Sequence, residues 1–298
     1  MPRVAANGIA LETEVHGGLA AGRPLVLIRG LGTQMVQWAP GFLDALVARG
    51  HAVVIFDNRD VGRSTWFDEA GVPALSDVVA AVAAGTPPPV PYTLEDMADD
   101  IAGLLDAHGL ETAHIVGMSM GGMLTTVFGA RHPDRVRSLV PIMASTGNPA
   151  LPPPTPAAME ALMSPSPSER AAYIAHHVRT AKVLASPAYP VPDEARAELA
   201  ARVFDRAFHP QGVARQYAAI VASGDRRAQL ATITAPTLVI HGADDPLVRV
   251  EGGRDIAATI PGADWLEVPG MGHDLPPGLF ELLADAITGH TEKAESAR

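Results

Sequence analysis

The chain has 298 residues, of which 33 are acidic and 22 are basic, so its formal net charge is −11 with histidine neutral. A protein that follows nucleic-acid phosphates needs clustered lysine and arginine, whereas here the basic residues are scattered and outnumbered. With 47% hydrophobic and 18% charged residues, the composition is that of a folded protein with a large core. Cysteine is absent, which excludes disulfides, thiolate nucleophiles, iron–sulfur clusters and cysteine-type zinc sites.

The apolar segments are short. The first eight residues contain no apolar run between a basic stretch and a small-residue cleavage site, so they do not match a signal peptide. The longest apolar runs are strand-sized and far below the roughly 18 residues needed to cross a bilayer. We therefore expect no membrane span and a cytoplasmic location.

The predicted elements begin with a β-hairpin, because Asn7-Gly8 separates the short segments 3–5 and 9–15 and favours a type I′ turn. A capped helix is expected from Thr93, which is followed by acidic residues and by an apolar stripe of helical period. Continuous apolar runs, typical of strands buried on both faces, occupy 24–28, 51–56, 113–118, 137–143, 237–241 and 265–268.

This alternation of strands and helices predicts an α/β protein with a mostly parallel central sheet and helices on both of its faces. From about 147 to 233 the composition changes, since prolines interrupt alanine-rich helical stretches and no convincing strand is found. We therefore predict a core domain of residues 1–146 and 234–298, and a helical cap inserted at 147–233.

The strongest functional motif is the segment 117–121, GMSMG, which lies between an apolar strand and a small-residue helix. It is a G-x-S-x-G nucleophile elbow in the required context. Such a turn lifts the hydroxyl of Ser119 out of the sheet, and the helix behind it favours developing negative charge. Ser119 is therefore the predicted nucleophile.

A hydroxyl nucleophile needs a general base and a carboxylate that orients the base. The segment 242–246, GADDP, and the segment 269–274, PGMGHD, each follow a predicted strand, at the sheet edge where ligands bind. His273 is the predicted base because glycines at 270 and 272 place it on an open loop, whereas His241 is expected to be structural. The pattern alone leaves Asp244 and Asp245 open as the acid.

Hydrolysis through a tetrahedral intermediate also needs two donors for the oxyanion. The backbone N–H of Met120 follows the nucleophile directly, and Leu31 in the glycine-rich bend after 24–28 is the candidate for the second donor. The bend could instead be an ordinary tight turn, and it is a weak match to a dinucleotide fingerprint because Met35 stands where the third glycine belongs. We expect the polar segment 57–64 to brace this loop.

The candidate substrate-binding residues lie in two places. Gly30 and Met118 are expected beside the nucleophile, and Phe204 and Phe208 are expected to close over the substrate from the cap. The wider set of apolar and aromatic cap residues that we expect to set specificity is Met159, Met163, Tyr173, Tyr189, Phe204, Phe208 and Tyr217.

Together these motifs resemble those of the α/β-hydrolase superfamily along nearly the whole chain. Within it they are similar to capped esterases of the aclacinomycin methylesterase and non-haem haloperoxidase-like kinds. The resemblance implies an α/β-hydrolase fold with Ser119 as nucleophile and His273 as base. It also selects Asp245 as the acid, because in related esterases the acid lies three residues after the glycine, and this leaves Asp244 to stabilise the turn.

The same resemblance implies Leu31 and Met120 as the oxyanion donors. One departure concerns the residue before Gly30. The family often has His-Gly after its third strand, and here Arg29 stands in place of the histidine. This exchange leaves backbone donation by the loop unaffected, but it changes the side chain on which the usual bracing of the loop depends.

The expected function is hydrolysis of small to medium, fairly apolar carboxylic esters through an acyl-enzyme. The same triad also serves perhydrolysis, acyl transfer, lactone opening and carbon–carbon bond hydrolysis, and a non-catalytic ligand-binding member of the fold is a further alternative. The expected partner is a small-molecule ester, with no nucleic acid, no metal and no organic cofactor; a homodimer is left open.

Overall fold

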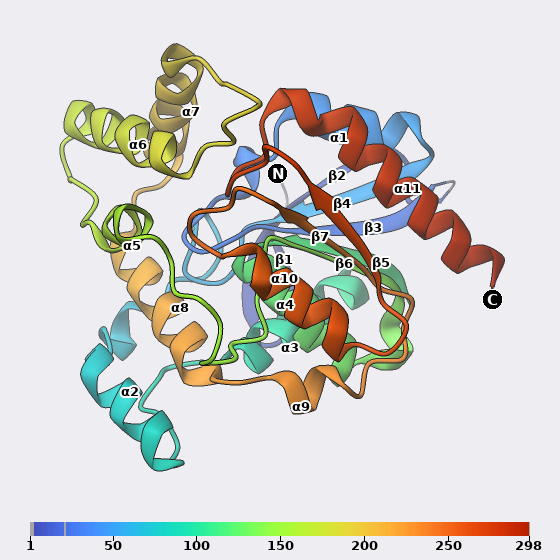
Figure 1. Ribbon diagram of the computed structural model, residues 1–298, viewed down its shortest axis with the longest axis horizontal. Coiled ribbons are helices and arrows are strands. Elements are labelled where there is room, and N and C mark those ends of the chain that lie inside the picture. The colour runs from blue at the N-terminus through green and yellow to red at the C-terminus, as the bar shows by residue number, and fades with distance from the viewer. Residues whose placement is uncertain (1–2, 21, 298) are drawn as a thin grey trace.

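The computed structural model describes residues 3–20 and 22–297 and contains one eight-stranded sheet of order β1-β2-β4-β3-β5-β6-β7-β8 (Figure 1). Strand β2 (Ile9–His16) pairs in antiparallel fashion with both of its neighbours, β1 (Arg3–Ala6) and β4 (His51–Phe56). All other pairs of adjacent strands in the sheet are parallel. The remaining strands are β3 (Arg23–Ile28), β5 (Ala113–Met118), β6 (Val136–Ile142), β7 (Leu238–Gly242) and β8 (Asp264–Val268). The predicted mostly parallel α/β fold is confirmed.

The N-terminal hairpin forms as expected. Asn7 and Gly8 both have positive φ, 47° and 76°, as a type I′ turn requires. The predicted helix start is also confirmed, since the side chain of Thr93 accepts a hydrogen bond from the backbone N–H of Asp96 and that carboxylate accepts from the N–H of Thr93. This capped helix is α3 (Leu94–Ala107).

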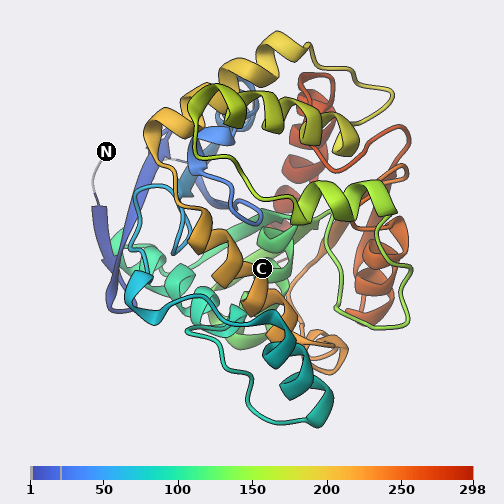
Figure 2. The same ribbon diagram turned by 90° about the vertical axis from the view of Figure 1, so that its left-hand side faces the viewer.

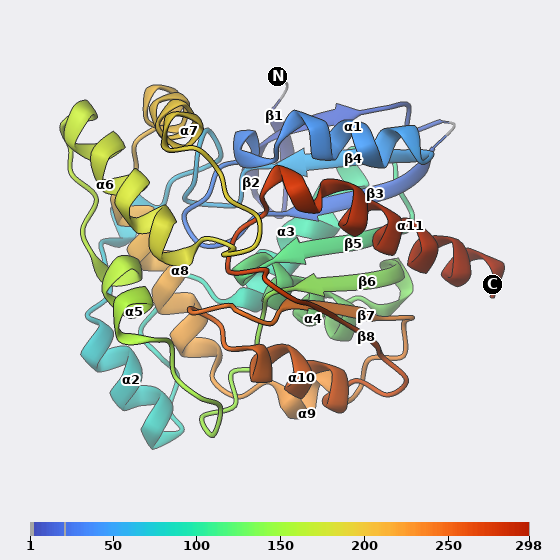
Figure 3. The same cartoon turned by 45° about the horizontal axis from the view of Figure 1, so that its top comes forward.

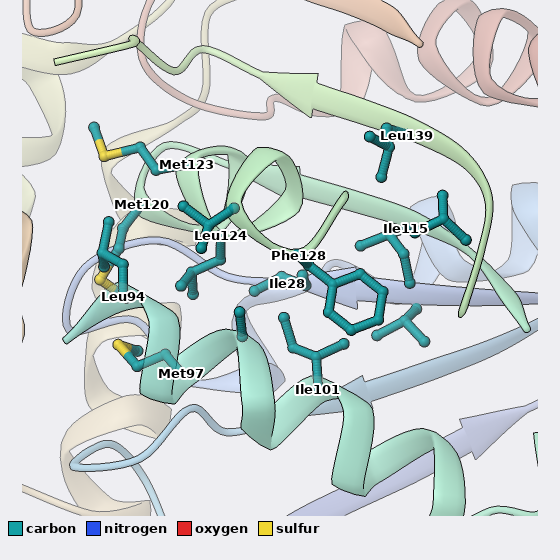
Figure 4. Close-up of a cluster of buried hydrophobic side chains, with 14 of the residues drawn as sticks. Ile28, Leu94, Met97, Ile101, Ile115, Met120, Met123, Leu124, Phe128 and Leu139 are labelled. Carbon is teal, nitrogen blue, oxygen red and sulfur yellow. The ribbon is translucent and has the colours of Figure 1, made fainter. Parts of the chain in front are cut away.

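Helices cover both faces of the sheet (Figure 3). One face packs against α1 (Pro40–Ala48) and α11 (Phe280–Ser296), and the other against α3, α4 (Met120–Arg131) and α10 (Val250–Thr259). Figure 4 shows Leu124 and Phe128 of α4 in one cluster with Met97 and Ile101 of α3. Since every residue of β4 and β5 is buried, these strands read as continuous apolar runs.

Five helices separate β6 from β7; the first four lie beyond the carboxyl ends of the parallel strands (Figures 1 and 2), and the last packs on α4 and α10. They are α5 (Pro156–Met163), α6 (Arg170–Leu184), α7 (Asp193–Arg206), α8 (Pro210–Ser223) and α9 (Arg227–Leu230). A further helix, α2 (Leu75–Ala84), packs on α8. We call residues 147–233 the helical insert; its standing as a cap domain separate from the core remains a prediction.

Short 3-10 turns complete the chain, at Met35–Gln37, Asp68–Ala70, Pro133–Arg135 and Pro277–Leu279. One strand differs from expectation: the run 265–268, expected to be buried centrally, belongs to β8 at the edge of the sheet, and most of its residues are only partly buried. Trp265 packs toward α10, whereas Leu266 and Val268 belong to the cluster that α11 covers on the other face. Within the described part of the chain, no helix is both long and apolar enough to cross a bilayer.

Candidate active site

Ser119 occupies the turn between β5 and α4, with backbone dihedral angles of φ 58° and ψ −123°. Positive φ is unfavourable for a residue with a side chain, and the surrounding backbone holds it there: its N–H donates to the carbonyl of Ile142 at 2.9 Å. Glycine is needed on both sides. A Cβ on Gly117 would lie 2.1 Å from the carbonyl oxygen of Gly121, and a Cβ on Gly121 would lie 2.2 Å from that of Ile28.

The structure brings Ser119, His273 and Asp245 together from the ends of three strands. Nε2 of His273 lies 2.9 Å from Oγ of Ser119, and Nδ1 lies 2.7 Å from Oδ2 of Asp245. The side chain of His273 is 7% exposed and that of Asp245 is 0% exposed. Both distances allow hydrogen bonds, so a proton can move between Ser119 and His273 while Asp245 holds the ring.

The carboxylate of Asp245 is fully engaged. Its Oδ1 accepts the backbone N–H groups of Leu247 and Val248 at 2.8 and 2.9 Å, and its Oδ2 faces His273 and, at 3.5 Å, Nε2 of His241. Burial alone would raise the pKa of Asp245, but the charge of His273 and the hydrogen bonds from both histidines outweigh it and hold this pKa well below its usual value. Asp245 is therefore an anion that can stabilise a protonated His273.

The neighbouring acid, Asp244, points elsewhere. Its exposed carboxylate accepts the N–H of Gly270 at 2.9 Å, and its own N–H donates to the carbonyl of Met271 at 3.1 Å. Asp244 thus ties the loop after β7 to the loop that carries the histidine. This is the turn-stabilising position that the resemblance implies.

The histidine loop is also held by the last residue of α6 and the segment that follows it in the helical insert. The N–H of His273 donates to the carbonyl of Leu184 at 2.8 Å, and the N–H of Gly272 donates to Oγ of Ser186 at 2.9 Å. The hydroxyl of Ser186 in turn donates to Asp274. The position of the imidazole therefore depends on residues of the insert, which the sequence motifs did not indicate.

The predicted oxyanion donors, Leu31 and Met120, line the same cavity as Ser119. The loop after β3 comes very close to Ser119, since a Cβ on Gly30 would lie only 3.1 Å from Cβ of Ser119. The loop after β3 and the first residue of α4 therefore both lie beside Ser119, and their role as donors to an oxyanion stays a prediction.

Buried side chains brace this loop. The N–H of Gly32 donates to Oε1 of Gln216 at 2.8 Å, and Nε2 of the same side chain donates to the carbonyl of Arg59 at 2.7 Å. The amide of Asn58 donates to the carbonyl of Arg29 at 3.1 Å. The predicted bracing by segment 57–64 is therefore present, and Gln216 of α8 adds a brace that sequence reasoning missed.

Two buried carboxylates of the same segment pair with arginines of the insert. Asp57 lies 2.7 Å from Arg206 and also accepts the N–H of Met35 at 2.7 Å, while Asp60 lies 2.8 Å from Arg215. Burial raises the pKa of Asp57, and the guanidinium of Arg206 offsets part of that effect. Because all four charged side chains are at most 8% exposed, removing one partner would leave a costly unpaired charge.

Arg29, which stands where the family often has histidine, turns away from the cavity. Its guanidinium lies 4.8 Å from the centre of the Trp38 ring, and Nη1 contacts the sulfur of Met118 at 3.0 Å. Burial lowers the pKa of Arg29 to about 10. The arginine packs on an aromatic face, as weakly hydrated guanidinium groups do.

A cavity of about 340 Å³ opens at Ser119. It lies within the usual size range of small-molecule sites. Most of its lining is apolar and includes Leu31, Met123, Leu151, Met159, Leu162 and Ile220. The polar groups on its wall, Ser145, Asn148, Tyr217 and Arg249, were not among the sequence-predicted site residues, although Tyr217 was noted as an aromatic residue of the cap.

The four predicted substrate-binding residues do not line this cavity. Gly30 lies against the side chain of Ser119, and Met118 is buried against Arg29. Phe204 and Phe208 pack on Tyr173, with ring centres 5.0 and 5.8 Å away, in a small core between α6 and α7. The physical reason is that two helices standing outside the main domain must bury an apolar face of their own.

Comparison with known proteins identifies the family. The family model described as alpha/beta hydrolase fold matches residues 23–276. The chain is 29% identical to the rhodomycin D methylesterase DauP of Streptomyces sp. (strain C5) over 299 residues, which cover 93% of each protein. It is 32% identical to the carbamate hydrolase RutD of Caulobacter segnis over 267 residues, which cover 87% of this chain and 88% of RutD.

Solved structures agree on the fold. The meta-cleavage product hydrolase CumD of Pseudomonas fluorescens IP01 superimposes with a TM-score of 0.78 at 20% identity, covering 99% of this chain and 98% of CumD. The enol-lactonase of Burkholderia xenovorans LB400 gives a TM-score of 0.67 at 23% identity, covering 99% of this chain and all of that one. Because the family model covers most of the sequence, the chain belongs to the α/β-hydrolase family and is a hydrolytic enzyme.

Proposed function

We propose that this protein is a serine carboxylic ester hydrolase that acts on small to medium, largely apolar esters. The observation that carries the proposal is the continuous contact from Asp245 through His273 to Ser119, which ends at the wall of an apolar cavity. Residues of these three types, in this order, perform nucleophilic acyl transfer on several unrelated folds.

The geometry supports the following sequence of steps. The Nδ1–H group of His273 donates a hydrogen bond to Asp245, and Nε2 accepts the hydroxyl proton of Ser119 while Oγ attacks the ester carbon. The N–H groups of Leu31 and Met120 then stabilise the oxyanion. His273 passes its proton to the leaving alcohol, and an acyl-enzyme remains. Water deprotonated by the same nitrogen attacks the acyl carbon and releases the acid.

The size and lining of the cavity support the substrate range. A volume of about 340 Å³ is at the lower end of small-molecule sites, which favours esters of modest size. The similarity to a rhodomycin D methylesterase supports ester cleavage as the reaction. The cytoplasmic location and the homodimer stay predictions.

Replacement of Ser119 by alanine tests the proposal. We expect Ser119→Ala to fold normally and to lose several orders of magnitude in ester turnover, with about 10³ to 10⁴-fold acceleration over water left from the oxyanion donors and binding. Hydrolysis of p-nitrophenyl esters of increasing acyl length gives the rates. Ser76→Ala, at an exposed position on α2, is the matched control.

A fluorophosphonate probe separates an enzyme from a ligand-binding member of the fold. It should label the unmodified protein and Ser76→Ala but not Ser119→Ala. Near-normal turnover by Ser119→Ala, or failure of the unmodified protein to react with the probe, would overturn the proposed mechanism.

A further inference from the structure

The cavity at Ser119 carries one formal charge among its described lining residues, and it belongs to Arg249. This arginine follows Asp245 by four residues, directly before α10, and is half-buried. The rest of the wall is apolar or uncharged. A neutral, apolar ester would gain no interaction from a cation at this place, because covering an unpaired guanidinium with such a substrate only adds a desolvation cost.

Arg249 has no acidic partner within the described chain. No carboxylate lies within 4.0 Å of it, and its one hydrogen bond is a long contact of 3.5 Å from Nη1 to the backbone carbonyl of Asp245. Arg254, on the same helix, behaves differently, since it is exposed and lies 2.8 Å from Glu267. The guanidinium of Arg249 thus keeps most of its five donors free beside the cavity.

Further donors lie on the same wall. A Cβ on Gly252 in the first turn of α10 would lie 3.1 Å from Cβ of Ser145, so this turn and the loop after β6 are in direct contact. Ser145 and Tyr217 also line the cavity, and the hydroxyl group of neither takes part in a hydrogen bond with another described residue. Three residues with side-chain donors, Arg249, Ser145 and Tyr217, therefore line a largely apolar cavity.

The position before α10 adds to this positive character, because the first turn of a ten-residue helix presents free N–H groups. Glu251 in that turn opposes it in part. However, Glu251 does not line the cavity and lies more than 4.0 Å from the guanidinium of Arg249. The charge that faces the substrate is therefore positive.

We propose that Arg249 binds a carboxylate that the substrate carries in addition to its ester group, so that the preferred substrates are ester carboxylates such as the half-esters of dicarboxylic acids. This inference rests on the proposed ester hydrolysis and narrows its substrate class. A guanidinium–carboxylate pair is strong in an apolar cavity, and its directional hydrogen bonds would orient the ester carbonyl toward Ser119.

Two pairs of substrates test the proposal with pH-stat measurement of acid release. Monomethyl glutarate against methyl butyrate places the carboxylate on the acyl side, and 4-acetoxybutanoate against propyl acetate places it on the alcohol side. We expect the unmodified enzyme to prefer the anionic member of at least one pair by tenfold or more in kcat/KM. Arg249→Met should lower that ratio by about tenfold to a hundredfold, and Arg249→Lys should keep part of it.

Arg254→Met is the matched control, and its ratio should equal that of the unmodified enzyme. Equal kcat/KM within both pairs, or a preference that Arg249→Met leaves intact, would overturn the role of Arg249. Calorimetric binding of monomethyl glutarate to Ser119→Ala, with and without Arg249→Met, does not depend on turnover. If no ester is hydrolysed but binding still requires Arg249, the proposed reaction fails and the carboxylate site stands.

Discussion

Replacement of Asp245 by asparagine separates the role of this residue from that of its neighbour. The two backbone N–H groups of Leu247 and Val248 point at Oδ1, so an asparagine keeps these bonds only if its carbonyl oxygen occupies that place. Its NH₂ group then faces Nδ1 of His273 at the 2.7 Å that the carboxylate now spans. A donor in this position forces Nδ1 to act as acceptor and moves the ring proton to Nε2.

The proton on Nε2 then faces Oγ of Ser119, where the mechanism needs an acceptor. The structure offers no relief, because Nε2 of His241, 3.5 Å from the same carboxylate oxygen, already contacts the carbonyl of Val248 at 2.7 Å. We expect Asp245→Asn to lower kcat/KM by on the order of 10⁴, which corresponds to about 5 kcal/mol of transition-state stabilisation.

The matched control is Asp244→Asn, whose exposed side chain accepts only the N–H of Gly270 and can keep that bond through its carbonyl oxygen. Its loss should be at most about tenfold, in the range of one hydrogen bond on a loop. Rates with p-nitrophenyl acetate, together with a thermal melt of each variant, give the comparison. If Asp244→Asn is the more damaging exchange while both variants remain folded, our assignment of the acid is refuted.

Two further predictions concern buried polar groups. Gln216→Leu leaves the N–H of Gly32 and the carbonyl of Arg59 without partners, so it should lower the free energy of unfolding by about 2–4 kcal/mol in urea titrations and reduce kcat more than it changes KM. Gln216→Glu keeps the acceptor for the N–H of Gly32 and should retain more activity. Equal kcat for both variants would contradict the bracing role. Burial lowers the pKa of His114 to about 4 from the unfolded value of 6.5, so between these pH values the unfolded chain takes up the proton first and stability falls as pH falls. Between pH 7 and pH 4.5, the free energy of unfolding of His114→Gln should therefore fall by up to about 2.5 kcal/mol less than that of the unmodified protein. An identical fall in both proteins would show that this histidine does not titrate as the structure implies.

The part of the site that the sequence predicts is the part whose geometry depends on backbone alone. The turn at Ser119 tolerates only glycine at 117 and 121, because a Cβ at Gly117 would lie 2.1 Å, and one at Gly121 2.2 Å, from a backbone carbonyl oxygen. Such positions leave a pattern in the sequence. The histidine loop is similar, since a side chain at Gly272 would lie 2.6 Å from the carbonyl oxygen of Ala185.

The lining of the cavity could not be predicted in the same way. Phe204 and Phe208 satisfy every sequence criterion for a substrate-binding wall, yet α6 and α7 use them to bury Tyr173. Arg249 gave no signal, because a single arginine after a turn is normally a solvated side chain. Whether such residues face the substrate is decided by how the helical insert packs on the sheet edge, which no local pattern encodes.

The contacts of the insert suggest why specificity and catalysis are linked in this chain. Gln216 from α8 fixes the loop of the predicted oxyanion donor Leu31, and the carbonyl of Leu184 at the end of α6 fixes the loop of His273. Asp57 and Asp60 tie the same insert to the sheet through buried ion pairs. A change that repositions α6 or α8 to admit another substrate is therefore expected also to move the loop of the predicted oxyanion donor and the loop of His273. Because displacements of about 1 Å at such groups reduce rates by roughly a hundredfold, specificity changes should be better tolerated at Arg249, whose side chain supports neither loop.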